Sequence, residues 1–204
     1  RYMLLLMNNA RIGVGFECIG LCEAAHRMAR EYAAQRPSMG KSIDRHEMIA
    51  DMLDEMDSDI RGLRVLAMEG AFHEELGQKK RLQAQLSNDG ARRAELEAEL
   101  AVHKRRARRV TPLLKYLAAE KAVEMSRRCV QIHGGNGYMK EYGAEKLLRD
   151  AVVMPIYEGT SQIQSLMAMK DCLAGIMKNP RRFVRKSAQA AWRSKSARDP
   201  LERR

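Results

Sequence analysis

The sequence predicts an all-α protein built as an antiparallel helix bundle, and three observations lead to this fold class. Aromatic residues make up only 5% of the chain, whereas it contains 14 methionines, which favour helices and fill irregular gaps between them. Apolar residues recur at helical spacing over long stretches. No segment shows the alternation that is typical of a strand. A chain of 204 residues can bury a core of its own, so we expect one domain.

Five core helices are expected, each bounded by a glycine, a proline or a capping residue. They cover about residues 2–35, 43–76, 111–132, 144–154 and 160–177. Thr111 and Pro112 suit the N-cap and the first helical position, so the third helix is expected to begin there. It should stop at Gly134 and Gly135.

Residues 77–110 have a different composition, rich in Lys, Arg, Glu, Gln, Ala and Leu. Residues 87–90, Ser-Asn-Asp-Gly, predict a turn between two helical arms. The narrow leucine stripe on these arms indicates an inserted hairpin that packs on itself or on a partner. We therefore expect a helical-bundle domain over residues 1–178, with this insertion at about 77–110, followed by a basic tail over 179–204.

The net charge of +11 is concentrated at the C-terminus. Residues 180–204 hold nine basic and two acidic side chains, which gives +7 there and leaves +4 for the rest. The simpler interpretation is a solvated or partly disordered end, and the alternative is an arm that binds nucleic acid or acidic lipid. No apolar run is long enough for a membrane span, and no signal peptide is visible.

The four cysteines show no pairing pattern, which favours reduced thiols in a cytoplasmic compartment. Cys18, Cys22 and His26 fall on one side of a helix but lack a fourth ligand. Packed thiols are therefore favoured over a metal site, and no metal is expected.

Two short motifs carry possible chemistry. Glu158 precedes a helix, and Gly159 beside it leaves room for a substrate to approach the carboxylate. A poorly hydrated carboxylate of this kind can remove a weakly acidic, carbon-bound proton. Gly134 and Gly135 can turn several backbone N–H groups outward, as a nest for pyrophosphate oxygens. Taken singly, each motif is more often structural: a capping segment for Glu158 and Gly159, and a helix C-cap for the glycine pair.

In combination, the motifs are more specific. The stretch QIHGGNGY at 131–138, then Arg149-Asp150, then IYEGTSQIQ at 156–164, resembles the C-terminal signature of the acyl-CoA dehydrogenase family. The resemblance covers residues 7–76 and 111–175. The hairpin and the tail are similar to additions in larger bacterial members. The resemblance implies the C-terminal helical domain of a longer enzyme, a domain that is inactive alone.

The resemblance also implies a reaction: FAD-dependent conversion of an acyl-CoA thioester to a trans-2-enoyl-CoA. Glu158 matches the base that removes the α-proton, and its backbone N–H matches a donor to the thioester carbonyl. Tyr157, Gly159 and Arg11 match positions beside the substrate. The positions that match FAD contacts are Arg36, Ser38, Met39, Gln131, Gly134, Gly135, Thr160 and Gln162. Met39 stands where the family usually has Phe.

The same resemblance implies a bacterial, cytoplasmic flavoprotein of fatty acid metabolism. The expected partners are an acyl-CoA substrate, an electron-transfer flavoprotein and other copies of the chain. Arg36 and Gln131 match residues that reach FAD across a subunit boundary, which implies a homodimer or homotetramer. Two alternatives stay open: a DNA-associated member of the family that uses the basic tail, and a non-catalytic oligomerisation module. The complete motif around Glu158 favours the enzyme.

Overall fold

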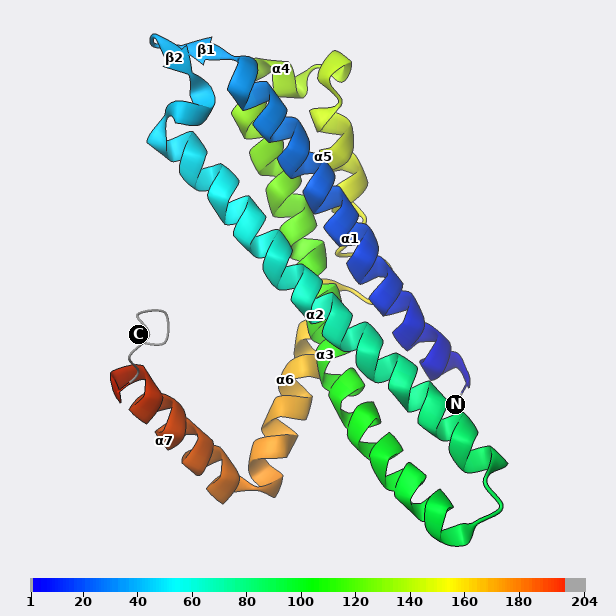
Figure 1. Ribbon diagram of the computed structural model, residues 1–204. Helices are drawn as coiled ribbons and strands as arrows, with labels where there is room; N and C mark the ends of the chain where they lie inside the picture. Colours follow the sequence, from blue (N-terminus) through cyan, green and yellow to red (C-terminus); the bar gives the residue numbers. More distant parts are fainter. Residues whose placement is uncertain (1, 197–204) are drawn as a thin grey trace. The chain divides into compact units, whose positions relative to one another are not determined.

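The computed structural model describes residues 2–196, with side chains from residue 9 onward. The chain is helical over almost all of this length (Figure 1). Its elements are α1 (Tyr2–Gln35), β1 (Pro37–Ser38), β2 (Lys41–Ser42), the 3-10 helix η1 (Ile43–Arg45), α2 (Glu47–Leu86), α3 (Gly90–His133), α4 (Gly135–Tyr138), the 3-10 helix η2 (Lys140–Tyr142), α5 (Ala144–Val152), α6 (Ser161–Lys178) and α7 (Pro180–Ser196). The described residues divide into two compact units, with the boundary inside α6 after Ser165.

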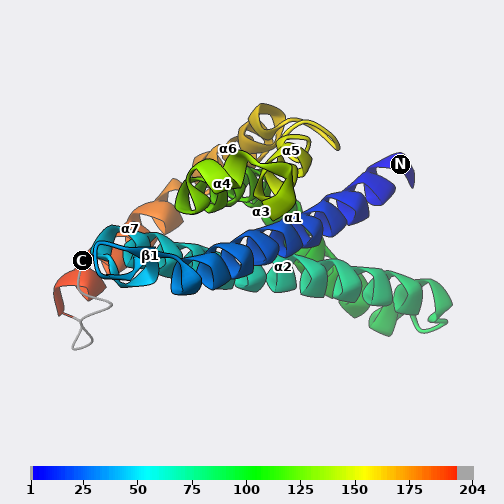
Figure 2. The ribbon, with the colours of Figure 1, turned by 90° about the horizontal axis from the view of Figure 1, so that it is seen from above.

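The first unit is an antiparallel bundle. Helices α1, α2 and α3 pack against one another over most of their length, and the shorter α5 packs on α3 and α1 (Figure 2). This confirms the predicted fold class.

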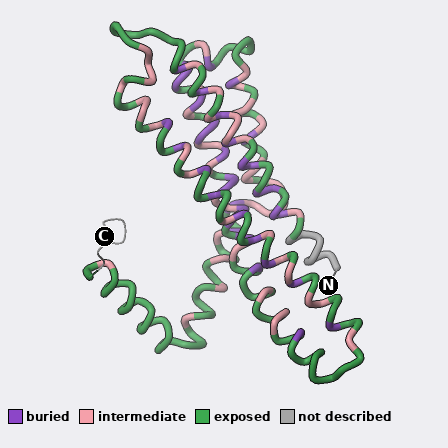
Figure 3. The backbone as a smooth tube through the Cα atoms, in the orientation of Figure 1, coloured by how far each residue is buried: buried purple, intermediate pink, exposed green. Residues whose placement is uncertain are grey.

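Small side chains let α1 approach its neighbours closely. The buried stripe of α1 recurs every three or four residues, and each of its members is fully buried: Cys18, Cys22, Ala25, Ala29 and Ala33. The facing core positions of α3 include Leu114, Ala118, Ala122, Met125 and Cys129. Figure 3 shows these buried positions lining the inside of the bundle while its outer faces are exposed. The core is therefore narrow and continuous along the helices.

Helix α1 agrees with the predicted first helix, whereas the predicted start of the third helix is wrong. Thr111 and Pro112 lie inside α3, which has already run for about six turns from Gly90. A proline inside a helix removes one backbone hydrogen bond, but here both flanking segments are held against α2. Packing of the long apolar face therefore overrides the local signal for a helix start.

The predicted turn at residues 87–90 is confirmed, and the hairpin packs on itself. Its arms are direct continuations of α2 and α3 rather than separate helices. Ala84 and Leu96 are buried between the arms, and Lys80 forms an ion pair with Glu99 at 2.5 Å. The hairpin is thus a long extension of the two central helices.

A two-residue antiparallel ladder, which the sequence did not indicate, closes the connection between α1 and α2. Pro37 pairs with Ser42 and Ser38 with Lys41. Met39 and Gly40 form the turn, with φ values of 47° and 81°. Positive φ at both central positions is the geometry of a type I′ turn, which is common in two-residue hairpins.

The second unit contains the rest of α6 and all of α7. The end of the chain, expected to be solvated or partly disordered, is solvated but folds as a helix over residues 180–196. Residues 197–204 of the predicted tail lie outside the described part of the chain. Among the described residues, no helix is both long enough and apolar enough to cross a membrane.

Candidate active site

Glu158 lies in the turn that joins α5 to α6, inside the first unit. Its φ is 54° and that of Gly159 is 94°, so two successive residues have left-handed backbone. A residue with a large side chain rarely adopts this conformation, and it persists only where surrounding contacts hold it. The Glu158 side chain is half-buried. The turn is thus a strained segment that presents a partly hydrated carboxylate.

A buried lysine holds both ends of this turn. The ammonium group of Lys115, in the middle of α3, donates hydrogen bonds to the carbonyl oxygens of Met154 and Gly159, each at 2.8 Å. Lys115 is fully buried. Burial lowers the pKa of its ammonium group, and the nearby Cys18 and Glu158 oppose that change.

Two further side chains hold the carbonyl of Glu158 itself. Arg11 of α1 donates through Nε, and Gln164 of α6 donates through Nε2, each at 3.3 Å from that oxygen. Arg11 and Gln164 are both buried. A Cβ atom placed on Gly159 would lie only 2.3 Å from Gln164 Nε2. Gly159 is therefore required by packing as well as by its φ.

Tyr157 and Thr160 make local contacts on either side. The Tyr157 hydroxyl donates to the Glu17 carboxylate of α1 at 2.5 Å. Thr160 Oγ1 accepts a hydrogen bond from the Ile163 backbone at 3.4 Å, as an N-cap of α6 would. Gln162, the second residue of α6, is exposed.

A second group of predicted residues lies at the far end of α1. Arg36, Ser38 and Met39 are exposed on the β1–β2 hairpin. Figure 1 shows this hairpin and α4, which follows Gly134, at the same end of the bundle. Gln131 is exposed there as well.

Tyr32 joins the two parts of this end. Its ring stacks on His133 with centroids 4.2 Å apart, and its hydroxyl accepts a hydrogen bond from Asn136 at 2.9 Å. Gly134 has a φ of 61°, and Cβ atoms added at Gly134 or Gly135 would meet nothing within 4 Å. Tyr32 thus holds the residues on either side of the glycine turn, and the space beside Gly134 and Gly135 is open.

The structure thus brings the predicted residues together as two separate groups. Arg11 and Arg36 are 25 residues apart. A rise of 1.5 Å per residue along α1 separates them by about 37 Å. Within one chain, the Glu158 turn and the glycine turn are therefore two separate sites.

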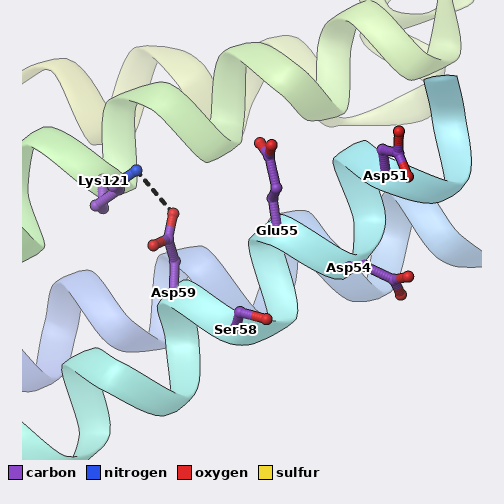
Figure 4. Close-up of a pocket in the computed structure, with 6 residues that line it drawn as sticks. All are labelled: Asp51, Asp54, Glu55, Ser58, Asp59 and Lys121. Atoms are coloured by element: carbon purple, nitrogen blue, oxygen red, sulfur yellow. Dashed lines mark ion pairs between the residues drawn. The ribbon is translucent and has the colours of Figure 1, made fainter. Parts of the chain in front are cut away.

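An acidic hollow on α2 is a different feature. It encloses about 460 Å³ and is lined by Asp51, Asp54, Glu55, Ser58, Asp59 and Lys121. Figure 4 shows the ion pair of Lys121 with Asp59, at 2.7 Å, beside the other carboxylates. Four carboxylates and one ammonium group line the hollow, so its net negative charge disfavours pyrophosphate and CoA phosphates. This hollow is therefore not the nucleotide site.

The sequence did not single out Lys115, Gln164 or Glu17 as functional residues. Lys115 carried a usable signal, because it is the one charged residue in the apolar stretch Leu113–Ala119. Cys18 and Cys22, which raised the question of a metal, are buried in the core, and burial raises the pKa of each thiol to about 12. Within residues 2–196 no group of three possible metal-binding side chains occurs.

The fold and its two groups of residues define an all-α bundle domain with a held carboxylate turn at mid-length and an open glycine turn at one end. The chain belongs to the acyl-CoA dehydrogenase family, because residues 1–173 match the family model described as acyl-CoA dehydrogenase, C-terminal domain. The match runs through the hairpin as well as the core helices.

Known relatives agree with this assignment. The chain is 36% identical to an acyl-CoA dehydrogenase of Bacillus subtilis, covering 83% of this chain and 38% of that protein. It is 31% identical to a subunit of the caffeyl-CoA reductase-Etf complex of Acetobacterium woodii, covering 77% and 34%. The fold is similar to that of an acyl-CoA dehydrogenase of Bacillus anthracis complexed with FAD, with a TM-score of 0.68, 23% identity and coverage of 97% and 32%. The chain spans about a third of the length of these proteins.

Proposed function

We propose that this chain is the C-terminal domain of an FAD-dependent acyl-CoA dehydrogenase in which Glu158 removes the α-proton of an acyl-CoA thioester. The observation that carries the proposal is the turn itself. Three buried side chains from three helices hold the backbone on both sides of one half-buried carboxylate. Positioning of this kind is what a general base requires, because proton transfer depends on a fixed distance and direction.

The proposed step forms a carbon–carbon double bond. The α-proton passes to the Glu158 carboxylate, and the electron pair of that C–H bond becomes part of the new π bond. Bound FAD would supply the acceptor for the hydride that leaves the β-carbon. Within the described residues no hydrogen bond uses the backbone N–H of Glu158, so this group can donate to the thioester oxygen as negative charge develops there. Tyr157 and Gly159 would border the thioester.

The residues at the glycine turn fit the pyrophosphate and adenosine parts of FAD. Gly134 and Gly135 leave the backbone open to a close ligand, and the exposed guanidinium of Arg36 can pair with phosphate oxygens. Ser38, Met39 and Gln131 would complete these contacts. Thr160 and Gln162 would meet the flavin beside Glu158.

The separation of the two groups supports a homodimer or homotetramer. One group would contact the FAD beside its own Glu158, and the other would contact the FAD of a neighbouring subunit. We also propose an electron-transfer flavoprotein as the electron acceptor, since one relative is named as part of a complex with such a protein. A reducing, cytoplasmic location is supported by the buried thiols of Cys18, Cys22 and Cys129.

The proposed base is tested by Glu158→Gln in the complete enzyme. The rate of flavin reduction by a panel of acyl-CoAs should fall by about 10²- to 10⁴-fold, the usual contribution of a general base. FAD content should not change, because the amide keeps the shape of the side chain. Glu141→Gln, at an exposed glutamate, is the matched control. If Glu158→Gln reduces the flavin at the wild-type rate, another group is the base.

A further inference from the structure

We propose that Lys115 is the positioning residue for Glu158: its ammonium group ties the two ends of the turn together and so fixes the direction of the carboxylate. The inference rests on the proposed role of Glu158 and adds to it a residue that does not itself touch the substrate. Arg11 and Gln164 complete the same clamp from α1 and α6.

The geometry of the hydrogen bonds carries this inference. Lys115 binds the carbonyl of Met154, where the turn begins, and the carbonyl of Gly159, directly after Glu158, each at 2.8 Å. One cation therefore closes a loop of six residues. Neither acceptor can move without losing a charge-assisted hydrogen bond in a buried setting, where such bonds are strongest.

The chemistry of the buried side chain supports a role beyond packing. A fully buried ammonium group is unfavourable unless it is paired, and the acceptors of its two hydrogen bonds are neutral carbonyl groups. A leucine or methionine would fill the same space without desolvating a charge. The Lys115 ammonium group therefore serves to donate two hydrogen bonds to one turn.

The backbone of the turn explains what the clamp does. Glu158 has left-handed backbone although it is not glycine, so the relaxed turn would rotate toward another conformation. Rotation about its φ and ψ would swing both the carboxylate and the backbone N–H away from their present directions. The two donors on its carbonyl, Arg11 and Gln164, oppose that rotation from the other side.

The test compares Lys115→Met with the wild type in the complete enzyme. Methionine keeps the length of the apolar stem and removes all three donors. We expect kcat to fall by about 10- to 100-fold, as displacement of a catalytic group by an ångström does. KM should change less than kcat, because Lys115 does not itself touch the substrate.

A second readout does not depend on turnover. A glutamate-specific protease should leave the bond after Glu158 intact in the wild type and cut it in Lys115→Met, since cleavage requires the turn to open. The cut is identified by the masses of the two fragments. Cleavage after Glu141, which lies outside the clamp, should proceed equally in both proteins.

Lys121→Met is the matched control for general destabilisation. Lys121 lies on the same helix and forms ion pairs with Asp59 and Glu124 outside the turn. Its replacement should lower the melting temperature without exposing the bond after Glu158 or changing kcat. If Lys115→Met behaves like this control, the proposal is overturned.

Two further variants keep the outcome decisive. If Lys115→Met does not fold, Gln164→Met decides, because it removes one donor to the Glu158 carbonyl and should give smaller changes in the same direction. An unchanged kcat and full protection in Gln164→Met would then reject the clamp. Glu158→Gln separates the two proposals: turnover at the wild-type rate rejects the base, whereas the protease result still reports on Lys115.

Discussion

The hydroxyl of Tyr157 lies 2.5 Å from the carboxylate of Glu17 and so ties the turn before Glu158 to the first helix of the bundle. Burial raises the pKa of the Tyr157 phenol, and the hydrogen bond to Glu17 adds to the effect. Tyr157 therefore stays a hydrogen-bond donor throughout the physiological range. The turn is held to α1 from two sides, since Arg11 contacts the next carbonyl.

Removing this hydroxyl should loosen the turn without unfolding the bundle. Tyr157→Phe is expected to lower the free energy of unfolding by about 1 kcal/mol, the usual net value of one hydrogen bond, because the Glu17 carboxylate is exposed and regains water. Urea unfolding measures this difference. Tyr138→Phe, at a ring that is 82% exposed, should leave stability unchanged, and an equal loss in both variants would argue against the Glu17 contact.

Gly159 should tolerate no side chain. Gly159→Ala places a methyl group 2.3 Å from Gln164 Nε2 at a φ of 94°. The backbone strain alone costs roughly 1–2 kcal/mol, and displacement of Gln164 adds to it. Thermal unfolding and flavin reduction in the complete enzyme should both be impaired. Gly13→Ala, where the added atom meets nothing, is the control and should be neutral or slightly stabilising.

The two ends of the glycine turn should respond differently to alanine. At Gly137 a Cβ atom would lie 2.4 Å from the Val130 carbonyl oxygen, so Gly137→Ala should destabilise the fold by about 1–3 kcal/mol. At Gly135 the added atom meets nothing, so stability should stay within about 0.5 kcal/mol.

FAD affinity should nevertheless fall in Gly135→Ala, because the methyl group would occupy the space through which the nucleotide approaches the backbone. Titration of the apoenzyme with FAD measures the dissociation constant. Unchanged affinity in a stable Gly135→Ala protein would place the pyrophosphate elsewhere.

Much of this fold could be predicted because its helices have long apolar faces. The end of α1 before Pro37 and the end of α3 at Gly134 follow from single residues with strong local preferences. The wrong start at Pro112 shows where such signals fail. A proline inside a helix and a proline that begins one look alike in sequence, and only packing against α2 decides between them.

The turn around Glu158 could be predicted only in part. Glu158 and Gly159 were recognisable from adjacent residues, whereas Lys115 acts from the distant helix α3 and Gln164 from the first turn of α6. Their importance depends on the carbonyl oxygens of Gly159 and Glu158, which the two side chains reach only after folding. A charged residue in an apolar stretch indicates that it has a buried partner, but the sequence does not identify that partner. Distance in sequence therefore explains why Lys115 was missed, whereas Gln164 lies only six residues after Glu158 and its contact forms only on folding.

The reactivity of the cysteines toward alkylation should depend on their burial. Cys18, Cys22 and Cys129 are buried, and burial raises the pKa of each thiol to about 12, so little thiolate is present at neutral pH. Cys172 is exposed on α6. Iodoacetamide should therefore modify one thiol rapidly in the native protein and four in urea, as counted by mass spectrometry. Rapid modification that persists in Cys172→Ser would mean that the core opens on the labelling timescale.

The hairpin should lose stability in mild acid through one pair of histidines. His73 Nδ1 and His103 Nδ1 lie 2.9 Å apart, so one ring donates and the other accepts while both are neutral. Burial, together with His103 and Arg106, lowers the pKa of His73, and Glu69 opposes the change. Because the folded-state pKa is below the unfolded value of about 6.5, the unfolded state binds more protons in this window. The stabilisation is complete above about pH 6.5 and is lost as the pH falls toward the folded-state pKa.

The melting temperature of the wild type should therefore drop more between pH 7.5 and 5.5 than that of His73→Gln. His46→Gln, outside the hairpin, should keep the wild-type slope, and identical slopes in all three proteins would show that the histidine pair does not govern acid stability.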